Sequence, residues 1–516
     1  MKNKFLQGAM ILTIAGMAVK VLGSVNRILL SRLLGGEGIG IYQIAYPIYL
    51  FLISISGAGV PVAISILVAK RVAEKDLLGA QRVFKTSLLL MTITGFLFAL
   101  SLYGASNWLI TSGIIRDGRA YYSLMALIPA VFFSTILASV RGFFQGHQLM
   151  TPPAISQILE QLVRVVVMLS LATYLLPQGL AYGAAGAAFG AVPGALMGII
   201  VLSCFYYKHQ ELRPQRGCPR EADRKESVWL LGKRLLVLAL SVSCANLMLP
   251  LVTGIDMLMV PWRLELAGFR VEEATRAFGY LAGMALPLVS MATIPTMSIA
   301  TSVVPALSEA RALGEKEKGE ERTLLALRLC LIFVLPATVG VMLLGTDLAK
   351  LLYGTLQAGP VISNLAPSIL FLGLHQVTTG ILQGQGYTVV PMATMGLSAL
   401  VKIGLLWLWV AQPSYNILGA AWASNVNFAV AALLNLGFLL RHGQMKLPYG
   451  SWLRITMSAA FMGAVVALSQ VLLGEIRLGV LLIVPLGIVS YGVALLALGE
   501  AKPAELKSLV LRRRKK

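Results

Sequence analysis

The chain has 516 residues, of which 57% are hydrophobic and only 13% are charged. A soluble domain carries about 45–50% apolar and about 25% charged residues, so this composition excludes a soluble multidomain enzyme, a disordered chain and a disulfide scaffold. The 43 Lys and Arg residues outnumber the 22 Asp and Glu residues, which gives a net charge of +21. We therefore expect a polytopic membrane protein whose basic surplus needs an explanation.

Fourteen apolar runs are long enough to cross a bilayer, which requires about 20 residues per helix. They cover residues 5–30, 44–69, 86–106, 120–140, 154–176, 182–207, 235–260, 280–305, 324–345, 361–382, 391–411, 416–439, 455–473 and 478–498. Lipid offers no partner for backbone N–H and C=O groups, and the runs lack the two-residue alternation of a membrane barrel. The sequence thus predicts an all-α polytopic fold of about 14 transmembrane helices.

The basic residues predict the orientation of these helices. If the N-terminus lies in the cytoplasm, thirty of the 43 Lys and Arg residues fall on the cytoplasmic side and eight on the other side. Cytoplasmic loops carry an excess of Lys and Arg. We therefore expect both termini in the cytoplasm, and an even number of spans agrees with this.

An internal repeat relates the two halves of the chain. Residues 141–153 (RGFFQGHQLMTPP) and residues 379–391 (TGILQGQGYTVVP) share the pattern Gly-x-x-Gln-Gly and a final Pro at an offset of 238. The same offset places Arg164 on Lys402. Six helices separate the copies, and because six is even the repeat is parallel. Two six-helix bundles that face each other across a central cavity are typical of a transporter.

The predicted organisation has four parts. These are an N-terminal six-helix lobe (1–208), a basic cytoplasmic linker (209–234), a C-terminal six-helix lobe (235–441) and two additional helices with a basic tail (442–516). No loop is large enough for a soluble catalytic domain, so we do not expect an enzyme. The four Cys and four His residues are dispersed and predict no disulfide framework, metal site or cofactor site.

An ionisable residue inside a membrane span costs free energy and commonly has a function. Lys20 and Arg27 share one face of the first helix with Ser24. The depth of Lys20 favours a cation that faces the cavity. Arg27 lies near the outer interface, so it either faces the cavity or extends to the lipid headgroups.

The fifth and eleventh predicted helices also carry charges. Glu160 and Arg164 stand at i, i+4, the spacing of an intrahelical ion pair. The pair is either a neutralised structural element or a cavity lining in which Arg164 meets an anion. Lys402 has no acid at i±4, and a substrate anion would satisfy it.

Asp256 lies near the outer end of the seventh predicted helix. It is either exposed at the interface, paired with Lys20 or Arg27, or bound to a coupling cation. Including Arg328 at a cytoplasmic helix end, the spans hold five cations against two acids, so the cavity is predicted to attract an anion. The alternative, a multidrug or cation antiporter, requires an acid-dominated cavity with Asp256 and Glu160 at its centre.

Several stretches of the chain resemble the family of stage V sporulation protein B and the polysaccharide-biosynthesis exporters. They are residues 141–153, 157–164, 20–23 (KVLG), 38–42 (GIGIY), 263–269 (RLELAGF), 283–287 (GMALP) and 302–309 (SVVPALSE). That family is part of the multidrug, oligosaccharidyl-lipid and polysaccharide exporter superfamily and is similar to the MurJ flippases of the lipid-linked peptidoglycan precursor.

The resemblance implies two six-helix lobes in a V, alternating access and an undecaprenyl-diphosphate-linked saccharide as cargo. It also implies the bacterial cytoplasmic membrane as location, a monomer among membrane lipids with a coupling cation as a possible partner, and no nucleic acid. The cavity cations map onto Lys20 and Arg27, and the last two helices help to form a groove for the lipid tail. One departure is that helix 44–69 carries no charge, whereas MurJ-type proteins have an acidic residue there and a basic one at its far end.

Overall fold

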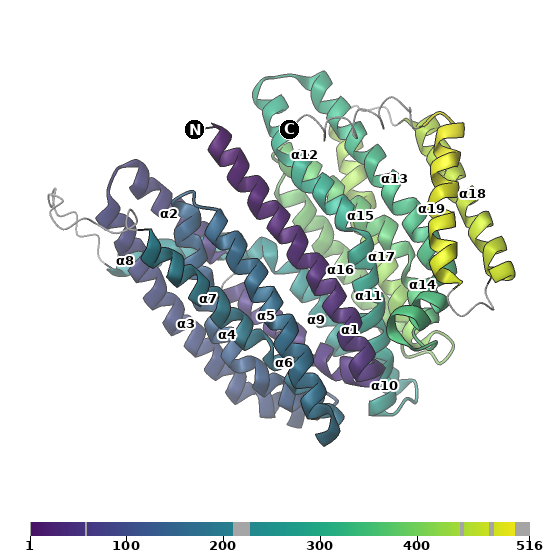
Figure 1. The fold of residues 1–516 in the computed structure, drawn as a ribbon, viewed down its shortest axis with the longest axis horizontal. Coiled ribbons are helices and arrows are strands. Elements are labelled where there is room, and N and C mark those ends of the chain that lie inside the picture. The colour runs from purple at the N-terminus through teal and green to yellow at the C-terminus, as the bar shows by residue number, and fades with distance from the viewer. Residues whose placement is uncertain (1, 57–58, 210–227, 444–447, 474–478, 501–516) are drawn as a thin grey trace. The chain divides into compact units, whose positions relative to one another are not determined.

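The structure, a computed structural model, describes residues 2–56, 59–209, 228–443, 448–473 and 479–500 (Figure 1). These residues form helices and no strand, which confirms the all-α membrane fold. Most of the predicted basic linker (210–227) and the predicted basic tail (501–516) lie outside the described residues.

Contacts divide the chain into two compact units, each with its own core. Unit 1 holds residues Met1–Glu265 and Phe269–Gly279, and unit 2 holds Leu266–Gly268 and Tyr280–Lys516. Helices just beyond the predicted linker therefore pack with the first half of the chain. The lobe boundaries drawn from the repeat stay a prediction, because packing groups helices by contact and not by their place in a repeat.

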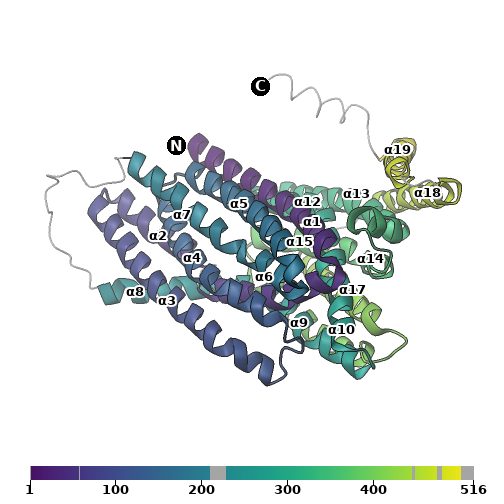
Figure 2. The same cartoon turned by 60° about the horizontal axis from the view of Figure 1, so that its bottom comes forward.

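The helices of unit 1 follow one another with short connections. They are α1 (Lys2–Ser56), α2 (Val60–Ala73), α3 (Leu77–Thr111), α4 (Ala120–Gly146), α5 (Thr151–Leu175), α6 (Leu180–Phe189), α7 (Ala191–Lys208), α8 (Val228–Asn246), α9 (Met248–Leu266) and α10 (Val271–Phe278). Among them α4 packs against α2, α3, α6 and α7, so it forms the centre of this unit (Figures 1 and 2).

Unit 2 begins with a π-helical stretch after Gly279 and contains the rest of the helices. They are α11 (Leu286–Ala292), α12 (Ile294–Ala312), α13 (Lys316–Leu348), α14 (Gly359–Leu365), α15 (Pro367–Gly384), α16 (Val389–Trp409), α17 (Asn416–Gly443), α18 (Tyr449–Leu473) and α19 (Val480–Ala497). Here α15 packs against α12, α13 and α17.

Ten helical segments in the described part of the chain are long and apolar enough to cross a membrane, or up to twelve if each of two bent pairs counts as one span. One of the ten, Ile14–Ala73, includes most of the predicted span 5–30 and all of the predicted span 44–69. The expected number of fourteen therefore stays a prediction. The presence of many apolar helices that could cross a membrane agrees with the sequence-based prediction.

The first two predicted spans are joined without a loop. The helical backbone of α1 is interrupted only at Gly35, whose φ is 66° and ψ is −175°. Glycine adopts this conformation readily because it has no Cβ. Residues 36–43, which the hydropathy pattern leaves between spans, are therefore helical, and this brings Glu37 into a folded element.

Two predicted spans are bent pairs of helices. Val271–Ala292 and Ile294–Ala312 meet at 49°, and Gly359–Leu365 and Pro367–Gly384 meet at 40°. In each pair the second helix has a proline in its first turn. Proline has no N–H to donate to the preceding turn, so a helix tends to break before it.

The repeated glycines make the same kind of close contact in both units. A Cβ on Gly142 of α4 would press against the backbone of Pro61 in α2, and a Cβ on Gly380 of α15 would press against the backbone of Ala300 in α12. Small residues let helix backbones approach closely where lipid supplies no hydrophobic driving force. The repeat itself stays a prediction, and these contacts support it.

Glu500, just after α19, links the end of this helix to α13 and α18; α19 lies beside α18 (Figure 1). Its side chain is 2% exposed and accepts hydrogen bonds from Arg328 Nε of α13 at 2.6 Å and Arg454 Nε of α18 at 3.0 Å, and from the hydroxyl of Ser451. Burial by itself raises the pKa of this carboxyl, but the hydrogen bonds from Ser451 and Arg328 and the two nearby guanidinium charges outweigh it and lower the pKa.

We expect Glu500→Gln to lower the free energy of unfolding by about 1–3 kcal/mol, because two guanidinium groups lose their acceptor. Since the folded-state pKa lies below the ordinary carboxylate value of about 4.3, the contribution of Glu500 is complete above that pH and is lost as the pH falls through the lowered value. Thermal unfolding in detergent between neutral and acid pH measures both effects. Glu321→Gln, an exposed change on α13, is the control. Equal acid sensitivity of Glu500→Gln and the native chain would contradict the assignment.

Candidate functional site

The two cations of the first helix lie on α1 about 10 Å apart along its axis, because a helix rises 1.5 Å per residue. Lys20 is exposed and Arg27 is partly buried. The Arg27 guanidinium carbon lies 5.9 Å from the ring centroid of Tyr46, which is the geometry of a cation–π contact. The same helix also contacts α5, where Asn26 Nδ2 lies 2.8 Å from Met168 Sδ.

Three tyrosines continue from this contact along α1. The Tyr42 and Tyr46 rings stack with centroids 5.2 Å apart, and Tyr46 and Tyr49 lie 5.7 Å apart. Tyr49 also shares a hydrogen bond of 3.0 Å with Ser134 of α4. All three rings are close enough to interact electrostatically with Arg164. The tyrosine rings thus lie between two of the predicted cavity cations, Arg27 and Arg164. We call the three tyrosines and these two arginines the arginine–tyrosine cluster.

The predicted Glu160–Arg164 ion pair is present within α5, with Arg164 Nη2 2.6 Å from Glu160 Oε1. A second guanidinium, from Arg141 of α4, lies 2.5 Å from Glu160 Oε2. The three side chains are 14–18% exposed. Two cations therefore share one carboxylate, and a positive charge remains in the span. The sequence missed Arg141 because it falls just after the predicted span 120–140.

Asp256 of α9 is 3% exposed. The expectation of an exposed interfacial carboxylate is therefore wrong, because the folded unit covers this part of α9. The pairing with Lys20 or Arg27 and the role in cation binding stay predictions.

Lys402 of α16 is 1% exposed and belongs to unit 2, whereas the other predicted cations belong to unit 1. The contact between Thr394 and Asn435, 2.7 Å long, fixes how α16 and α17 run against each other. Lys402 is therefore buried within unit 2, on a helix that packs against α17.

A second group of charges joins α1, the α3–α4 connection and α10, all within unit 1. Glu37 accepts from Arg119 Nη1 at 2.5 Å and from Arg276 Nη2 at 3.0 Å. Arg119 also bonds Asp117, which is 3% exposed and accepts from Thr275 of α10 at 2.8 Å. The hydrogen bonds to Asp117 and Glu37 raise the pKa of Arg119 despite its partial burial. We call these five residues the outer-end cluster, because the predicted orientation places them outside.

Backbone contact accompanies the outer-end cluster. A Cβ on Gly40 of α1 would overlap the carbonyl oxygen of Thr275, and a Cβ on Gly279 would overlap the carbonyl oxygen of Gly36. The ends of α1 and α10 therefore cross with their main chains touching, which only glycine permits here. The sequence contained one signal of this contact, the stretch 38–42, but not its partner.

Within the described residues, no group of three or more His, Cys, Asp and Glu side chains could hold a metal ion. The ion pairs around Glu160 and Glu37 in unit 1 consist of arginines that share a carboxylate. Such an arrangement can bind an anion, since guanidinium groups recognise phosphate with two parallel hydrogen bonds.

Several known proteins resemble this chain in sequence and in fold. Residues 5–311 match the family described as polysaccharide biosynthesis protein, and residues 281–408 match the MatE family. Stage V sporulation protein B of Bacillus subtilis (strain 168) is 31% identical over 436 residues, covering 84% of this chain and 83% of that protein. The chain belongs to the polysaccharide biosynthesis protein family.

Two further comparisons concern MurJ. The lipid II flippase MurJ of Bacillus subtilis (strain 168) is 26% identical over 509 residues, covering 92% of this chain and 90% of that protein. The solved structure of a lipid II flippase MurJ in an inward closed conformation shares the fold, with a TM-score of 0.72 at 16% identity over 94% of this chain and 98% of that one. This chain is accordingly a multi-pass membrane protein of that family, and it shares its fold with MurJ.

We expect Glu160→Gln to destabilise the protein by about 3–5 kcal/mol, because Arg141 and Arg164 would remain in the span without a counter-charge. Thermal unfolding of the purified protein in detergent measures this. The double change Glu160→Gln with Arg141→Gln restores the native net charge of the group and should recover part of the loss. Glu74→Gln, at an exposed position, is the control. A native midpoint for Glu160→Gln would show that the three charges are not coupled.

We also expect Gly40→Val to destabilise unit 1 by about 1–3 kcal/mol, because the new side chain cannot fit against α10. Gly16→Val is the matched control on the same helix, since a Cβ at Gly16 meets no atom within 4 Å. The midpoints of thermal unfolding compare the two variants. Equal midpoints would mean that α1 and α10 do not touch at Gly40.

Proposed function

We propose that this exporter translocates an undecaprenyl-diphosphate-linked cell-wall saccharide, a lipid II-like precursor or a related polysaccharide unit, across the bacterial cytoplasmic membrane by alternating access. The observation that carries the proposal is the arginine–tyrosine cluster together with Arg141. In unit 1 three guanidinium groups gather around a single carboxylate and a row of tyrosines. The names of the flippase relatives support the same class of cargo.

The diphosphate is the part of such a cargo that needs these cations. Arg27 is only partly buried, and Tyr46 beside it is also partly exposed. Lys20 lies on the same face of α1 and is exposed. We infer that Lys20 and Arg27 meet the diphosphate first and that Arg164 keeps the interior positive. Lys402 supplies the corresponding cation in unit 2. A positive, partly dry site concentrates an anionic ligand.

Alternating access requires contacts that can part. The outer-end cluster suits this role, because exposed or partly exposed ion pairs such as Glu37–Arg276 contribute little net free energy. At Gly40 the backbones of α1 and α10 touch, and no side chain of Gly40 interlocks with α10. We infer that release of the cargo to the outer leaflet separates α1 from α10 and that the cluster re-forms after the anion leaves.

The driving force is a membrane potential or a cation gradient. A charge that crosses the membrane gains about 2.3 kcal/mol per 100 mV. Asp256 is a buried carboxylate and is the best-placed residue for a coupling cation, with Glu160 second because two arginines already share it. We further propose a monomer with both termini in the cytoplasm and no nucleic-acid partner.

A multidrug or cation antiporter is the second candidate, supported by the MatE match over residues 281–408 and by the buried Asp256. That function needs carboxylates that are not already neutralised. The two arginines on Glu160 make it the weaker candidate.

Substitution of Arg27 tests the proposal directly. We expect Arg27→Ala to lower transport about tenfold or more, since a charged hydrogen bond to phosphate is worth about 1.5–3 kcal/mol, and Arg27→Lys to retain part of it. Arg32→Ala is the matched control, because Arg32 is an exposed arginine of the same helix. The readout is the accumulation of undecaprenyl-linked precursor in the inner leaflet of cells that depend on each variant.

Membrane insertion of every variant is monitored alongside transport. Native precursor turnover in fully inserted Lys20→Ala and Arg27→Ala variants would rule out the cationic site. Normal turnover after depletion of the protein, together with changed drug efflux, would favour the antiporter, and Asp256→Asn should then abolish that efflux.

A further inference from the structure

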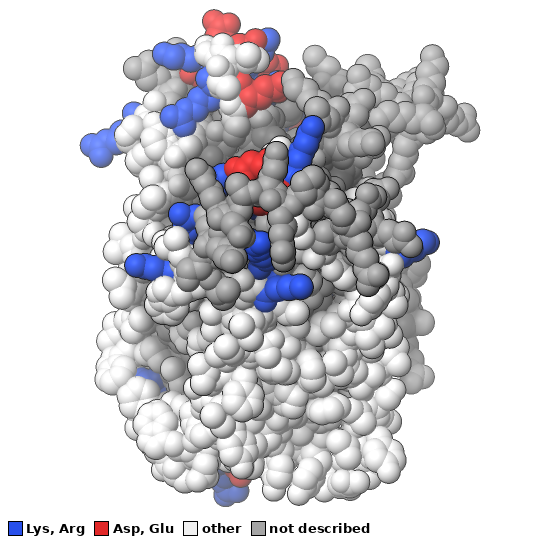
Figure 3. Space-filling model, turned by 90° about the vertical axis from the view of Figure 1, so that its left-hand side faces the viewer, with Lys and Arg blue, Asp and Glu red and all other residues white. Residues whose placement is uncertain are grey.

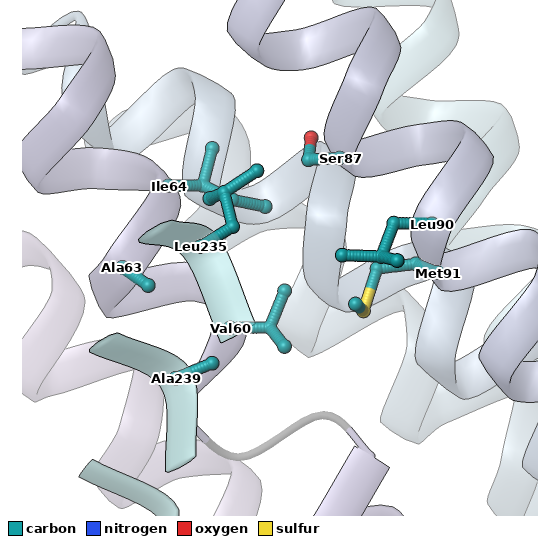
Figure 4. A pocket seen from close by; sticks show the side chains of 8 residues that line it. All are labelled: Val60, Ala63, Ile64, Ser87, Leu90, Met91, Leu235 and Ala239. Atoms are coloured by element: carbon teal, nitrogen blue, oxygen red, sulfur yellow. The ribbon is translucent and has the colours of Figure 1, made fainter. Parts of the chain in front are cut away.

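Few places in unit 1 offer a cation to an anionic ligand. On the face that Figure 3 shows, Lys and Arg side chains gather toward one end, and most of the remaining surface is uncharged. The hollow between α2, α3 and α8 in Figure 4 is lined by apolar core residues such as Val60 and Met91, and it has room for about one water molecule. An anion finds no partner in this hollow, so the way in which each cation of the arginine–tyrosine cluster is held becomes important.

The contact between Arg27 and Tyr46 joins the two helical segments of α1. Gly35, where the helical backbone is interrupted, lies between the two residues in the chain. A straight helix would place residues 19 positions apart about 28 Å from each other. The Arg27 guanidinium carbon instead lies 5.9 Å from the Tyr46 ring centroid, so the second segment turns back toward the first. This direction favours a cation that faces the protein over one that extends to the lipid headgroups.

Two further rings hold Tyr46 itself. Tyr42 and Tyr49 stand at i−4 and i+3, on the same face of α1, and their ring centroids lie 5.2 Å and 5.7 Å from that of Tyr46. Both are buried, whereas Tyr46 is partly exposed. The Tyr49 hydroxyl shares a hydrogen bond of 3.0 Å with Ser134 of α4, the helix at the centre of unit 1. A series of contacts therefore runs from α4 through the tyrosines to Arg27.

An aromatic ring holds a cation without neutralising it. The face of the ring attracts the positive charge, and it does not use up the five N–H donors of a guanidinium as a carboxylate does. In the part of the chain that the structure describes, no carboxylate pairs with Arg27, and Glu160 is already shared by two other arginines. The predicted span 44–69, which contains Tyr46, carries no charge. Arg27 thus keeps its charge and its donors for an anion.

We propose that Tyr46 is a positioning residue for the diphosphate of the cargo. Its ring holds the Arg27 guanidinium in place, and Arg27 donates to the phosphate oxygens. Ordering a long side chain during binding costs affinity, and a site in which the side chain is already ordered avoids that cost. The inference rests on the proposed function, because it takes a diphosphate as the anion. Tyr46 itself acts through Arg27 and does not contact the phosphate.

Titration of the purified full-length protein in detergent with undecaprenyl diphosphate tests this role. Undecaprenol, which has the same chain and no phosphate, is the second probe. We expect Tyr46→Leu to weaken the binding of undecaprenyl diphosphate about fivefold, since a partly exposed cation–π contact has an energy of this order. Tyr46→Phe keeps the ring and should bind as the native chain does. Undecaprenol should bind equally to all of these proteins.

A double-mutant cycle separates positioning from a general loss of packing. In the Arg27→Ala background, Tyr46→Leu should have no further effect on the binding of undecaprenyl diphosphate, because no guanidinium remains for the ring to hold. The matched control is Tyr103→Leu, which removes an exposed tyrosine of α3 and should leave binding at the native level.

A ring of altered charge provides the same test without a change of packing. A trifluorinated phenylalanine at position 46 keeps the shape of the ring but withdraws electron density from its face, which weakens the attraction for a cation. It should bind undecaprenyl diphosphate more weakly than Tyr46→Phe does, at an equal midpoint of thermal unfolding. This comparison decides the matter even if Tyr46→Leu fails to fold.

Several results would overturn the proposal. Equal weakening by Tyr46→Leu with and without Arg27 would mean that Tyr46 acts independently, and equal weakening of undecaprenol binding would indicate lost packing. Weak binding by Tyr46→Phe would assign the tyrosine hydroxyl to the cargo. If Arg27→Ala weakens binding but neither Tyr46→Leu nor the fluorinated ring does, the cationic site of the proposed function stands and the positioning role falls. Native binding by Arg27→Ala would remove both.

Discussion

Charges and backbone polar groups that enter the hydrocarbon must find their partners within the protein, and this constraint governs the whole structure. The Glu160 carboxylate is held by Arg141 and Arg164, and Glu500 by Arg328 and Arg454. In both places one acid binds two arginines from different turns or helices. Each carboxylate therefore joins elements, and each group keeps one positive charge in excess.

The close contacts between helices also follow from the surrounding lipid. Lipid tails are as apolar as the side chains that face them, so no hydrophobic driving force brings the helices together. Helices therefore associate where their backbones can approach closely. Gly142 and Gly380 provide such approaches inside the two units, and Gly40 and Gly279 provide one between α1 and α10. The first two are flanked by buried apolar side chains. The contact at Gly40 is surrounded by partly exposed ion pairs, which can separate at small cost.

Function follows from this difference in how firmly the charges are held. The arginines near Glu160 are fixed within the span, which suits a permanently positive interior for an anionic cargo. The pairs formed by Glu37 lie at the helix ends and suit a contact that opens and closes.

The sequence by itself determined the fold class, the sign of the intramembrane charge and the Glu160–Arg164 pair, because hydropathy and helical spacing are local properties. It placed Lys20, Arg27 and Lys402 on helices but could not show their surroundings. Only the tertiary structure brought Arg141 to Glu160 and set the three tyrosines of α1 near Arg164 of α5. It also buried Asp256 and joined Glu37 to Arg276, 239 residues away. The physical reason is that such contacts depend on how helices cross, and a crossing is decided jointly by residues on both helices.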